Sequence, residues 1–386
     1  MNTQRWMSTQ FFSFYLTWGI FLPYWSGWMI HTKGISVTQV SMIMSLGLVA
    51  RGLFTLFVYP FLAEKYSSKT LLNGMAIGSF ITILCYIPAD SFSSLLAVTL
   101  LLHIVYPTLM PALDSAAGLL VQHNQLKDYG KSRSWGSLGF IVPSLFLTAI
   151  TASMGDKVIL WALLIGMVLF VCLGFLRAPD ILSKKVKGQQ KKQVGIRSLF
   201  HTRHFGLVLI IVILLQAAHA SYYSYGYIFL QDIHAPQAFI GIILNISVFA
   251  EILFFTLADR VFRNFSVGAL MTLSAMGSSV RWIMVFAFPT VTVFCLSQTL
   301  HAFSFAMSHY AFMKFLIQQI PDRLIPQAQG IYSALALSWS TAVFTMLGGV
   351  LYEMDPRLAF LGMILCTIPA LLLAIVYQKS AVKKGN

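Results

Sequence analysis

Long apolar runs recur along the whole chain, and they restrict its fold more than any other feature. Each run has about 18 to 25 residues, which is enough for a helix to cross roughly 30 Å of hydrocarbon. In hydrocarbon, a single segment satisfies all its backbone N–H and C=O groups only when it is helical. The sequence therefore predicts an all-α membrane protein, with twelve transmembrane helices in two six-helix halves.

The positions of the predicted spans follow from the positions of these runs. Charged residues make up 10% of the chain, against about 25% in an ordinary soluble domain, so water is not the solvent for most of the surface. We predict spans at residues 8–30, 38–60, 70–88, 93–114, 133–152, 157–176, 204–230, 237–258, 267–287, 291–316, 327–349 and 357–377.

Lysine and arginine are distributed very unevenly about these spans. With an even number of spans and the N-terminus inside, the outside keeps only Lys33, Lys157 and Arg357. Because cytoplasmic loops are enriched in basic residues, this asymmetry predicts a bacterial inner-membrane protein with both termini in the cytoplasm. The net charge of +14 is not gathered on one polar face, so we expect a lipid bilayer as its surroundings and no nucleic-acid partner.

The longest polar stretch divides the chain near its middle. It contains SKKVKGQQKKQ, which cannot bury enough apolar surface to fold by itself. We therefore predict an N-terminal half over residues 1–176, a basic cytoplasmic linker over 177–203, and a C-terminal half with a short cytoplasmic tail over 204–386.

The sequence gives little support for catalysis. It contains neither the HExxH pattern of zinc hydrolases nor a GxxxxGK[ST] phosphate loop. The HTRH segment from His201 to His204 lacks a useful carboxylate, and the four cysteines stand singly in apolar runs, as small buried hydrophobes do. We expect no enzymatic activity, no metal and no cofactor, and we place a membrane enzyme or a non-transporting receptor below a transporter.

Several charged residues lie inside or at the edges of predicted spans. A charge near the bilayer centre costs at least about 2.5–3.5 kcal/mol on insertion scales, so each needs a partner or a polar cavity. Because they belong to different helices, we predict that they meet in a central cavity together with neutral histidines. The charged residues are Arg51, Asp114, Arg133, Glu251 and Arg281, and the main histidines are His219 and His301.

A short segment after the second span is repeated after the eighth. LAEKYSSK at residues 62–69 matches LADRVFRN at 257–264. An acid followed by a base in such a turn resembles the signature loop of the major facilitator superfamily, whose two halves are related about the membrane normal. The resemblance implies a gate in which Glu64, or Asp259 with Arg260, caps a neighbouring helix N-terminus and holds the inward side closed.

The segment DYGKSRSWGSLGF at residues 128–140 is the most specific motif. It resembles the region between the fourth and fifth helices of lactose permease and of the related nucleoside and 3-phenylpropionate proton symporters. The resemblance implies that Asp114 pairs with Arg133 and binds substrate. VFAEILFF, SSVRWI and LSQTLHAF place Glu251, Arg281 and His301 at positions of that group's proton-coupling network.

One position departs from the lactose permease pattern. Where that pattern has a proton-carrying glutamate three residues after the histidine, this chain has Ser304. Serine cannot hold the proton, so we expect Glu251 to carry it, with Asp114 as the second candidate.

Across most of its length the chain is most similar to 3-phenylpropionate permeases, which implies uptake of a small aromatic monocarboxylate with a proton. Arginine can hold a carboxylate through two hydrogen bonds, and aromatic rings can stack on a phenyl group. Proton symport of a sugar or a nucleoside is the alternative, and a monomer is expected in either case. The predicted substrate-binding residues are Asp114, Arg133, Arg51, His219, Trp18, Trp25, Tyr222 and Tyr225.

Overall fold

The computed structural model describes residues 2–184, 197–321 and 324–382, and in these ranges all regular secondary structure is helical. The predicted all-α class is confirmed. Most of the basic run SKKVKGQQKKQ lies outside the described residues, so the predicted linker stays a prediction. Also outside are the side chains of Arg197, Asp259, Pro326, Ala381 and Val382.

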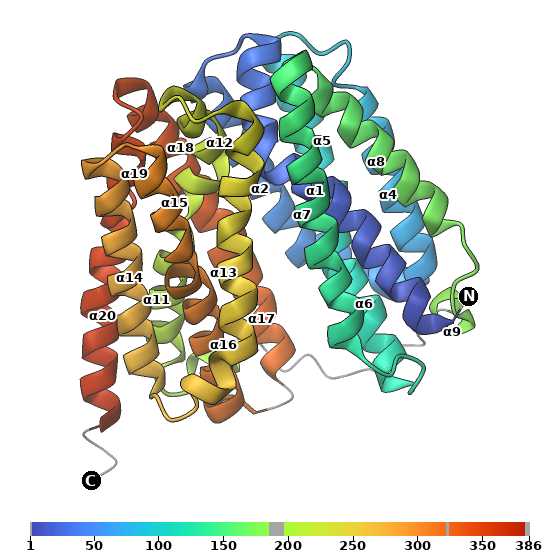
Figure 1. Cartoon of the computed structure of the whole chain (residues 1–386). Helices are drawn as coiled ribbons and strands as arrows, with labels where there is room; N and C mark the ends of the chain where they lie inside the picture. Colours follow the sequence, from blue (N-terminus) through green and yellow to red (C-terminus); the bar gives the residue numbers. More distant parts are fainter. Residues whose placement is uncertain (1, 185–196, 322–323, 383–386) are drawn as a thin grey trace. The chain divides into compact units, whose positions relative to one another are not determined.

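The chain forms two compact units (Figure 1). The first is Met1–Gln189 with Pro236–Ile242, and the second is Gln190–Ala235 with Ile243–Asn386. The helices of the first unit are α1 (Thr3–Lys33), α2 (Val37–Leu53), η1 (Phe54–Val58), α3 (Tyr59–Lys65), α4 (Ser68–Leu84), α5 (Phe92–Val105), α6 (Leu109–Gln122), α7 (Tyr129–Met154), α8 (Val158–Gly174), α9 (Asp180–Ser183) and η2 (Gln237–Phe239).

The second unit holds the helices that carry most of the predicted site. They are α10 (Arg197–Phe200), α11 (Phe205–Ala217), α12 (Ala220–Asp232), α13 (Ile240–Val261, whose first residues belong to the first unit), α14 (Val267–Ala287), α15 (Val291–Thr299), η3 (Ala302–Ala306), α16 (Met307–Gln319), α17 (Ile325–Ala334), η5 (Leu335–Trp339), α18 (Ser340–Met354), α19 (Leu358–Leu361) and α20 (Ile364–Val382).

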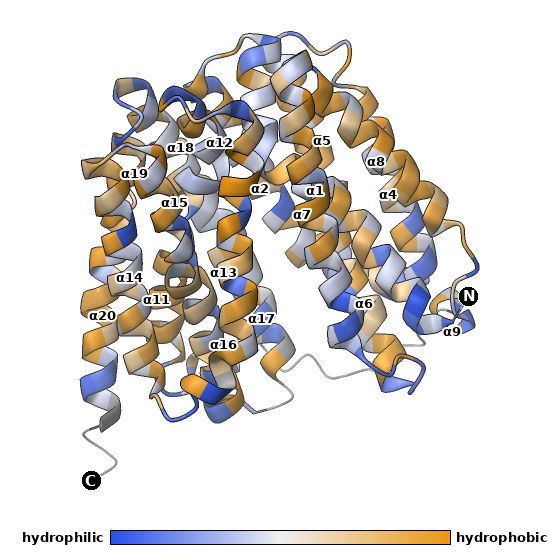
Figure 2. Ribbon diagram, viewed as in Figure 1, coloured by the Kyte–Doolittle hydropathy of each residue, from blue (hydrophilic) through white to orange (hydrophobic). Residues whose placement is uncertain are grey.

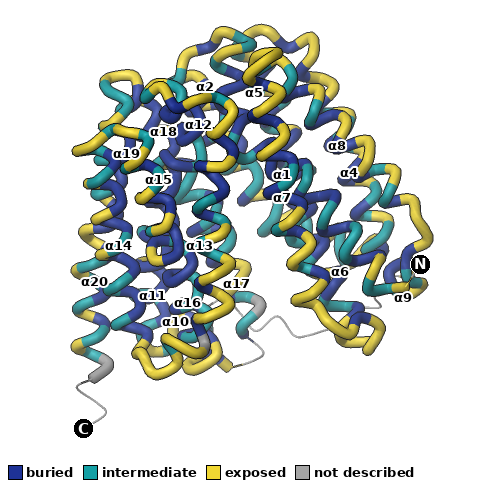
Figure 3. The backbone as a smooth tube through the Cα atoms, viewed as in Figure 1, coloured by how far each residue is buried: buried dark blue, intermediate teal, exposed yellow. Residues whose placement is uncertain are grey.

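Each predicted span falls on a helix or on consecutive helices. In the described ranges, nine such stretches are long and apolar enough to cross a membrane: Val37–Lys65, Phe92–Gln122, Tyr129–Met154, Phe205–Asp232, Gln237–Ala258, Val267–Ala287, Val291–Gln319, Gln327–Met354 and Leu358–Ser380. The other three predicted spans lie on α1, α4 and α8, of which α4 and α8 have 17 residues each. Figure 2 shows mostly apolar residues along α4 and α8, and Figure 3 shows exposed turns on both, as expected for helices in contact with lipid.

Several stretches that the sequence predicts as single spans are interrupted. Residues 106–108 separate α5 from α6, and residues 218–219 separate α11 from α12. The π-helical segments η1, η3 and η5 interrupt three more. Such interruptions are frequent at functional sites, and two of them hold predicted site residues: His219 lies between α11 and α12, and His301 directly precedes η3.

Glycine allows α1 and α7 to approach each other closely. A Cβ atom at Gly139 would lie 2.3 Å from the carbonyl oxygen of Phe12, and one at Gly19 would lie 2.3 Å from that of Phe140. Both clashes would be with backbone, which cannot turn aside as a side chain can. Small residues of this kind let membrane helices pack backbone to backbone.

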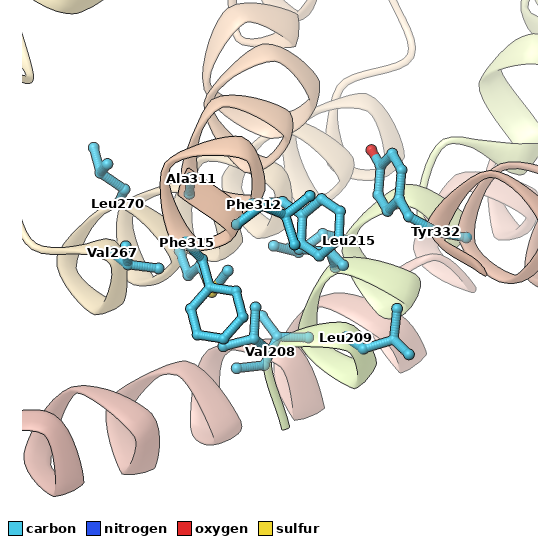
Figure 4. Close-up of a cluster of buried hydrophobic side chains, with 14 of the residues drawn as sticks. Val208, Leu209, Leu215, Val267, Leu270, Ala311, Phe312, Phe315 and Tyr332 are labelled. Carbon is cyan, nitrogen blue, oxygen red and sulfur yellow. The ribbon is translucent and has the colours of Figure 1, made fainter. Parts of the chain in front are cut away.

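A hydrophobic core fixes the helices around the site of the second unit. Leu215 of α11, Phe312 of α16 and Tyr332 of α17 lie close together in it, with at most 3% of each side chain exposed (Figure 4). Next to this core, the Gln216 amide of α11 donates a hydrogen bond to the Ser308 hydroxyl of α16 at 2.9 Å. The core therefore sets the spacing of α11, which ends shortly before His219, and α16, which begins directly after η3.

We predict that Gly139→Ala destabilises the protein by about 1–3 kcal/mol, because the added methyl group forces α1 and α7 apart. Gly118→Ala is the matched control, since a Cβ atom there has nothing within 4 Å. Thermal unfolding of the purified variants in detergent gives the comparison. An equal unfolding midpoint for the two variants would contradict the proposed close packing.

Candidate functional site

A group of predicted site residues meets inside the second unit. They come from α12, α13, α14, the α15–η3 helix and the interruption between α11 and α12. Most have 7% or less of their surface exposed, and Glu251 is half-buried. We call this group the buried polar cluster, and it consists of Arg281, His301, Glu251, His219 and Tyr222 together with Gln298 and Ser304.

Arg281 is the centre of this cluster. Its Nη1 atom donates to His301 Nδ1 at 2.9 Å and to Ser304 Oγ at 3.3 Å. Its Nη2 atom donates to Gln298 Oε1 at 3.1 Å. The residue has no exposed surface, so at Nη1 and Nη2 these contacts replace the water that a guanidinium would otherwise bind.

The contact with Arg281 determines which ring nitrogen of His301 carries the proton. A guanidinium has donors and no acceptor, so His301 Nδ1 must accept and the ring proton must be on Nε2. Nε2 lies 3.7 Å from Glu251 Oε2. The N–H group of a neutral His301 is therefore directed to the carboxylate that the sequence predicts as the proton carrier.

His219 has the opposite ring arrangement. Its Nδ1 lies 2.9 Å from the carbonyl oxygen of Leu215, which can only accept, so Nδ1 carries the proton. Its Nε2 then accepts from Ser304 Oγ at 3.0 Å. Ser304 thus accepts from Arg281 and donates to His219, and it links these two groups without carrying a charge.

Aromatic rings cover the guanidinium of Arg281. The Cζ atom lies 4.6 Å from the ring centroid of Tyr222 and 4.3 Å from that of Trp282, distances at which a cation is attracted to a ring. The Tyr222 hydroxyl lies 2.9 Å from Ser247 Oγ. Tyr225, which was also predicted to bind substrate, makes a different contact, because its hydroxyl donates to the carbonyl of Thr345 at 2.7 Å.

In the first unit, the structure brings Asp114 and Arg133 together. Arg133 Nε lies 3.9 Å from Asp114 Oδ1, and the Tyr129 hydroxyl donates to the same oxygen at 3.0 Å. Arg133 also donates to the Tyr15 hydroxyl and places its Cζ atom 4.3 Å from the Tyr15 ring. The two charged side chains are 34% and 40% exposed, so this ion pair is partly open.

The other residues predicted for the first unit lie in different surroundings. Arg51 is half-buried on α2. Trp25 stacks on Trp28 at 4.5 Å between ring centroids and has no exposed surface. Trp18 lies 5.6 Å from the ring of Tyr106. Both tryptophans therefore belong to the packed aromatic interior of this unit, and their roles toward substrate stay predictions.

The predicted gating residues lie at the C-terminal ends of α3 and α13. Glu64 and Arg260 are exposed, whereas the side chain of Asp259 lies outside the described residues. The helices that follow are capped by serines, since Ser67 Oγ accepts from the N–H of Thr70 in α4 and Ser266 Oγ accepts from the N–H of Ala269 in α14. A gating role for these charges stays a prediction.

Sequence reasoning assigned no role to Gln298, although it lies in the LSQTLHAF motif. Gln298 stands three residues before His301, about one helical turn, which places both side chains on the side of α15 and η3 that faces Arg281. An uncharged residue in a membrane span does not stand out in the sequence as a charged one does. Only the position of Gln298 in the motif could have indicated a role.

Comparison with known proteins gives consistent matches over nearly the whole chain. The sequence pattern of the MFS_1 like family matches residues 4–362. An Escherichia coli K12 protein named "Probable 3-phenylpropionic acid transporter" is 30% identical over 375 residues, which cover 97% of both chains. Maltose permease of Geobacillus stearothermophilus is 24% identical over 381 residues, which cover 96% of this chain and 93% of the permease.

Solved structures share the fold. Nucleoside transporter NupG superposes with a TM-score of 0.81 at 16% sequence identity, covering 98% of this chain and 99% of its own. A POT family transporter in complex with a thioalcohol conjugated peptide has a TM-score of 0.78 at 10% identity, covering 98% and 96%. At these identities the likeness concerns the fold alone.

We predict opposite tautomers for the two buried histidines at neutral pH, with the proton of His301 on Nε2 and that of His219 on Nδ1. Nitrogen-15 NMR of histidine-labelled protein distinguishes a protonated ring nitrogen from an accepting one. The variants His301→Gln and His219→Gln assign the signals. A His301 ring that is protonated on Nδ1 would contradict the hydrogen bond from Arg281.

Proposed function

Because this chain belongs to the MFS_1 like family and is a multi-pass membrane transporter of the major facilitator type, we propose that it imports a small aromatic carboxylate, such as 3-phenylpropionate, together with a proton. The observation that carries the proposal is the buried polar cluster, in which the N–H group of His301 is directed toward Glu251. The name of the E. coli relative supports the substrate class.

Glu251 is the proposed proton carrier. Its side chain is 29% exposed, so protons can reach it, while Arg281 beyond His301 is sealed from water. When Glu251 is ionised, it balances the charge of Arg281. When Glu251 is protonated, the cluster keeps one positive charge, and an anionic substrate restores neutrality. Proton and anion therefore favour each other's binding, which is the thermodynamic basis of symport.

Arg133 is the proposed contact for substrate in the first unit, with Asp114 beside it. Their separation of 3.9 Å is longer than a charge-assisted hydrogen bond, so Arg133 can exchange Asp114 for a substrate group. Arg51, Trp18, Trp25 and Tyr225 are further proposed contacts, and Asp114 is the second candidate for the proton.

Transport follows alternating access in this proposal, with Glu64, Asp259 and Arg260 acting in the inner gate of a monomer. Both termini are in the cytoplasm, and the membrane is the bacterial inner membrane. A monoanion that moves with one proton carries no net charge, so the pH gradient drives its uptake and the membrane potential adds nothing. Symport of a sugar is the second candidate, favoured by the similarity to maltose permease.

The first test is uptake of labelled 3-phenylpropionate into vesicles that contain the purified protein, with and without an inward proton gradient. We expect accumulation only with the gradient. If the vesicles accumulate maltose or a nucleoside and ignore 3-phenylpropionate, the fold assignment stands and the proposed substrate is wrong.

Glu251→Gln is the control for the proton-coupling role in the same vesicles. This variant should exchange internal for external substrate and fail to accumulate it, because glutamine resembles a permanently protonated glutamate. Gradient-driven accumulation by Glu251→Gln at the wild-type level would remove Glu251 as the carrier.

A further inference from the structure

The acceptors that surround Arg281 are all uncharged. His301 Nδ1, Ser304 Oγ and Gln298 Oε1 take its hydrogen bonds, and two aromatic rings cover its faces. A guanidinium stays protonated at any physiological pH, and the residue has no exposed surface. Arg281 is thus a buried cation with no charged group among the acceptors of its hydrogen bonds.

The two edges of this guanidinium differ in how many of their N–H groups have a hydrogen-bond acceptor. Nη1 donates to both His301 and Ser304. The opposite edge consists of Nε and Nη2, and there Nη2 donates to Gln298 while the buried Nε has no hydrogen-bond partner. A buried N–H group that lost its water without gaining an acceptor is unfavourable, so this edge is an incomplete binding site.

A carboxylate has the shape and charge that complete the edge. The Nε and Nη2 groups of arginine donate in parallel and match the two oxygens of a carboxylate. The single amide oxygen of Gln298 occupies half of this space and is nearly the same size as one carboxylate oxygen. A carboxylate that displaced Gln298 would fill the vacant contact at Nε and place a negative charge in direct contact with the guanidinium.

The surroundings of this edge are aromatic. Tyr222 and Trp282 flank Arg281, and Phe294 lies one helical turn before Gln298 on α15, with its ring centroid 6.4 Å from that of Tyr222. The faces of these rings are apolar, so a phenyl group packs well against them. The surroundings therefore fit a monocarboxylate whose remaining part is apolar or aromatic.

We propose that the Nε and Nη2 edge of Arg281 is the binding site for the substrate's carboxylate, and that Gln298 occupies this edge until substrate displaces it. The inference rests on the proposed function, in which the substrate is an aromatic monocarboxylate. It gives Arg281 a direct contact with substrate in addition to its predicted place in proton coupling, and it makes Gln298 a specificity-determining residue.

Gln298→Glu is the test, because it places a carboxylate on the edge permanently. Binding of 3-phenylpropionate to the full-length protein in nanodiscs, measured by calorimetry, should weaken about tenfold or more, the scale of a charge-assisted hydrogen bond. Gln298→Leu leaves the edge open and should retain binding or strengthen it. The uncharged amide of 3-phenylpropionate should bind poorly to the wild type.

Gln216→Glu is the matched control for adding a buried acid to the second unit. Gln216 is also buried, and its amide donates a hydrogen bond to a serine hydroxyl. Its substitution therefore also replaces a buried amide by a carboxyl group, but away from Arg281. Without substrate, Gln298→Glu should raise the thermal unfolding temperature because Arg281 gains a carboxylate in direct contact, whereas Gln216→Glu should lower it.

The outcomes separate the two proposals. Wild-type affinity in Gln298→Glu would overturn the assignment of the edge and leave the aromatic-acid function intact. If the wild-type protein fails to bind aromatic carboxylates and Gln298→Glu still unfolds at a higher temperature, the substrate is wrong and the anion-binding edge is supported. If neither binding nor stabilisation is seen, both proposals fail.

Discussion

A cation sealed inside a membrane-spanning unit needs acceptors for its donors, and Arg281 imposes this need on the second unit, where Nη1 and Nη2 have acceptors and Nε has none. Because a guanidinium only donates, it fixes His301 as an acceptor at Nδ1 and directs the ring N–H to Glu251. Through Ser304 it also orients the hydrogen bond to His219. The directions of the hydrogen bonds that join Arg281, His301 and Ser304 thus follow from one residue, and the proposal makes Glu251 the group whose charge changes.

The helices hold this cluster by two different means. Next to the cluster, apolar packing around Leu215 and Phe312 fixes the positions of α11 and α16 relative to each other. At the level of the cluster the helices are interrupted, by the break at residues 218–219 and by η3, and these interruptions bring His219 and Ser304 within 3.0 Å of each other. Apolar packing therefore holds the helices in place, and local departures from α-helical geometry bring the polar side chains together.

The sequence predicted the spans well because apolar runs have a direct cause in bilayer thickness. It also singled out Arg281, Glu251 and His301, which the structure places in one cluster, since titratable groups in hydrocarbon are costly enough to stand out. It gave no role to Gln298, which is uncharged, and could not show that Tyr225 bonds to Thr345 rather than joining the cluster. The tautomers depend on distances between helices, and the close approach at Gly139 depends on its neighbour, so neither can be read from one helix alone.

The central claim is that Glu251 takes up a proton when an anionic substrate binds. Calorimetry of 3-phenylpropionate binding in buffers of different ionisation enthalpy measures this proton directly, without transport. The wild-type protein should take up about one proton per substrate bound, and Glu251→Gln should take up none. Equal proton uptake by the two proteins would contradict the claim and move the proton to another residue, with Asp114 the first to be examined.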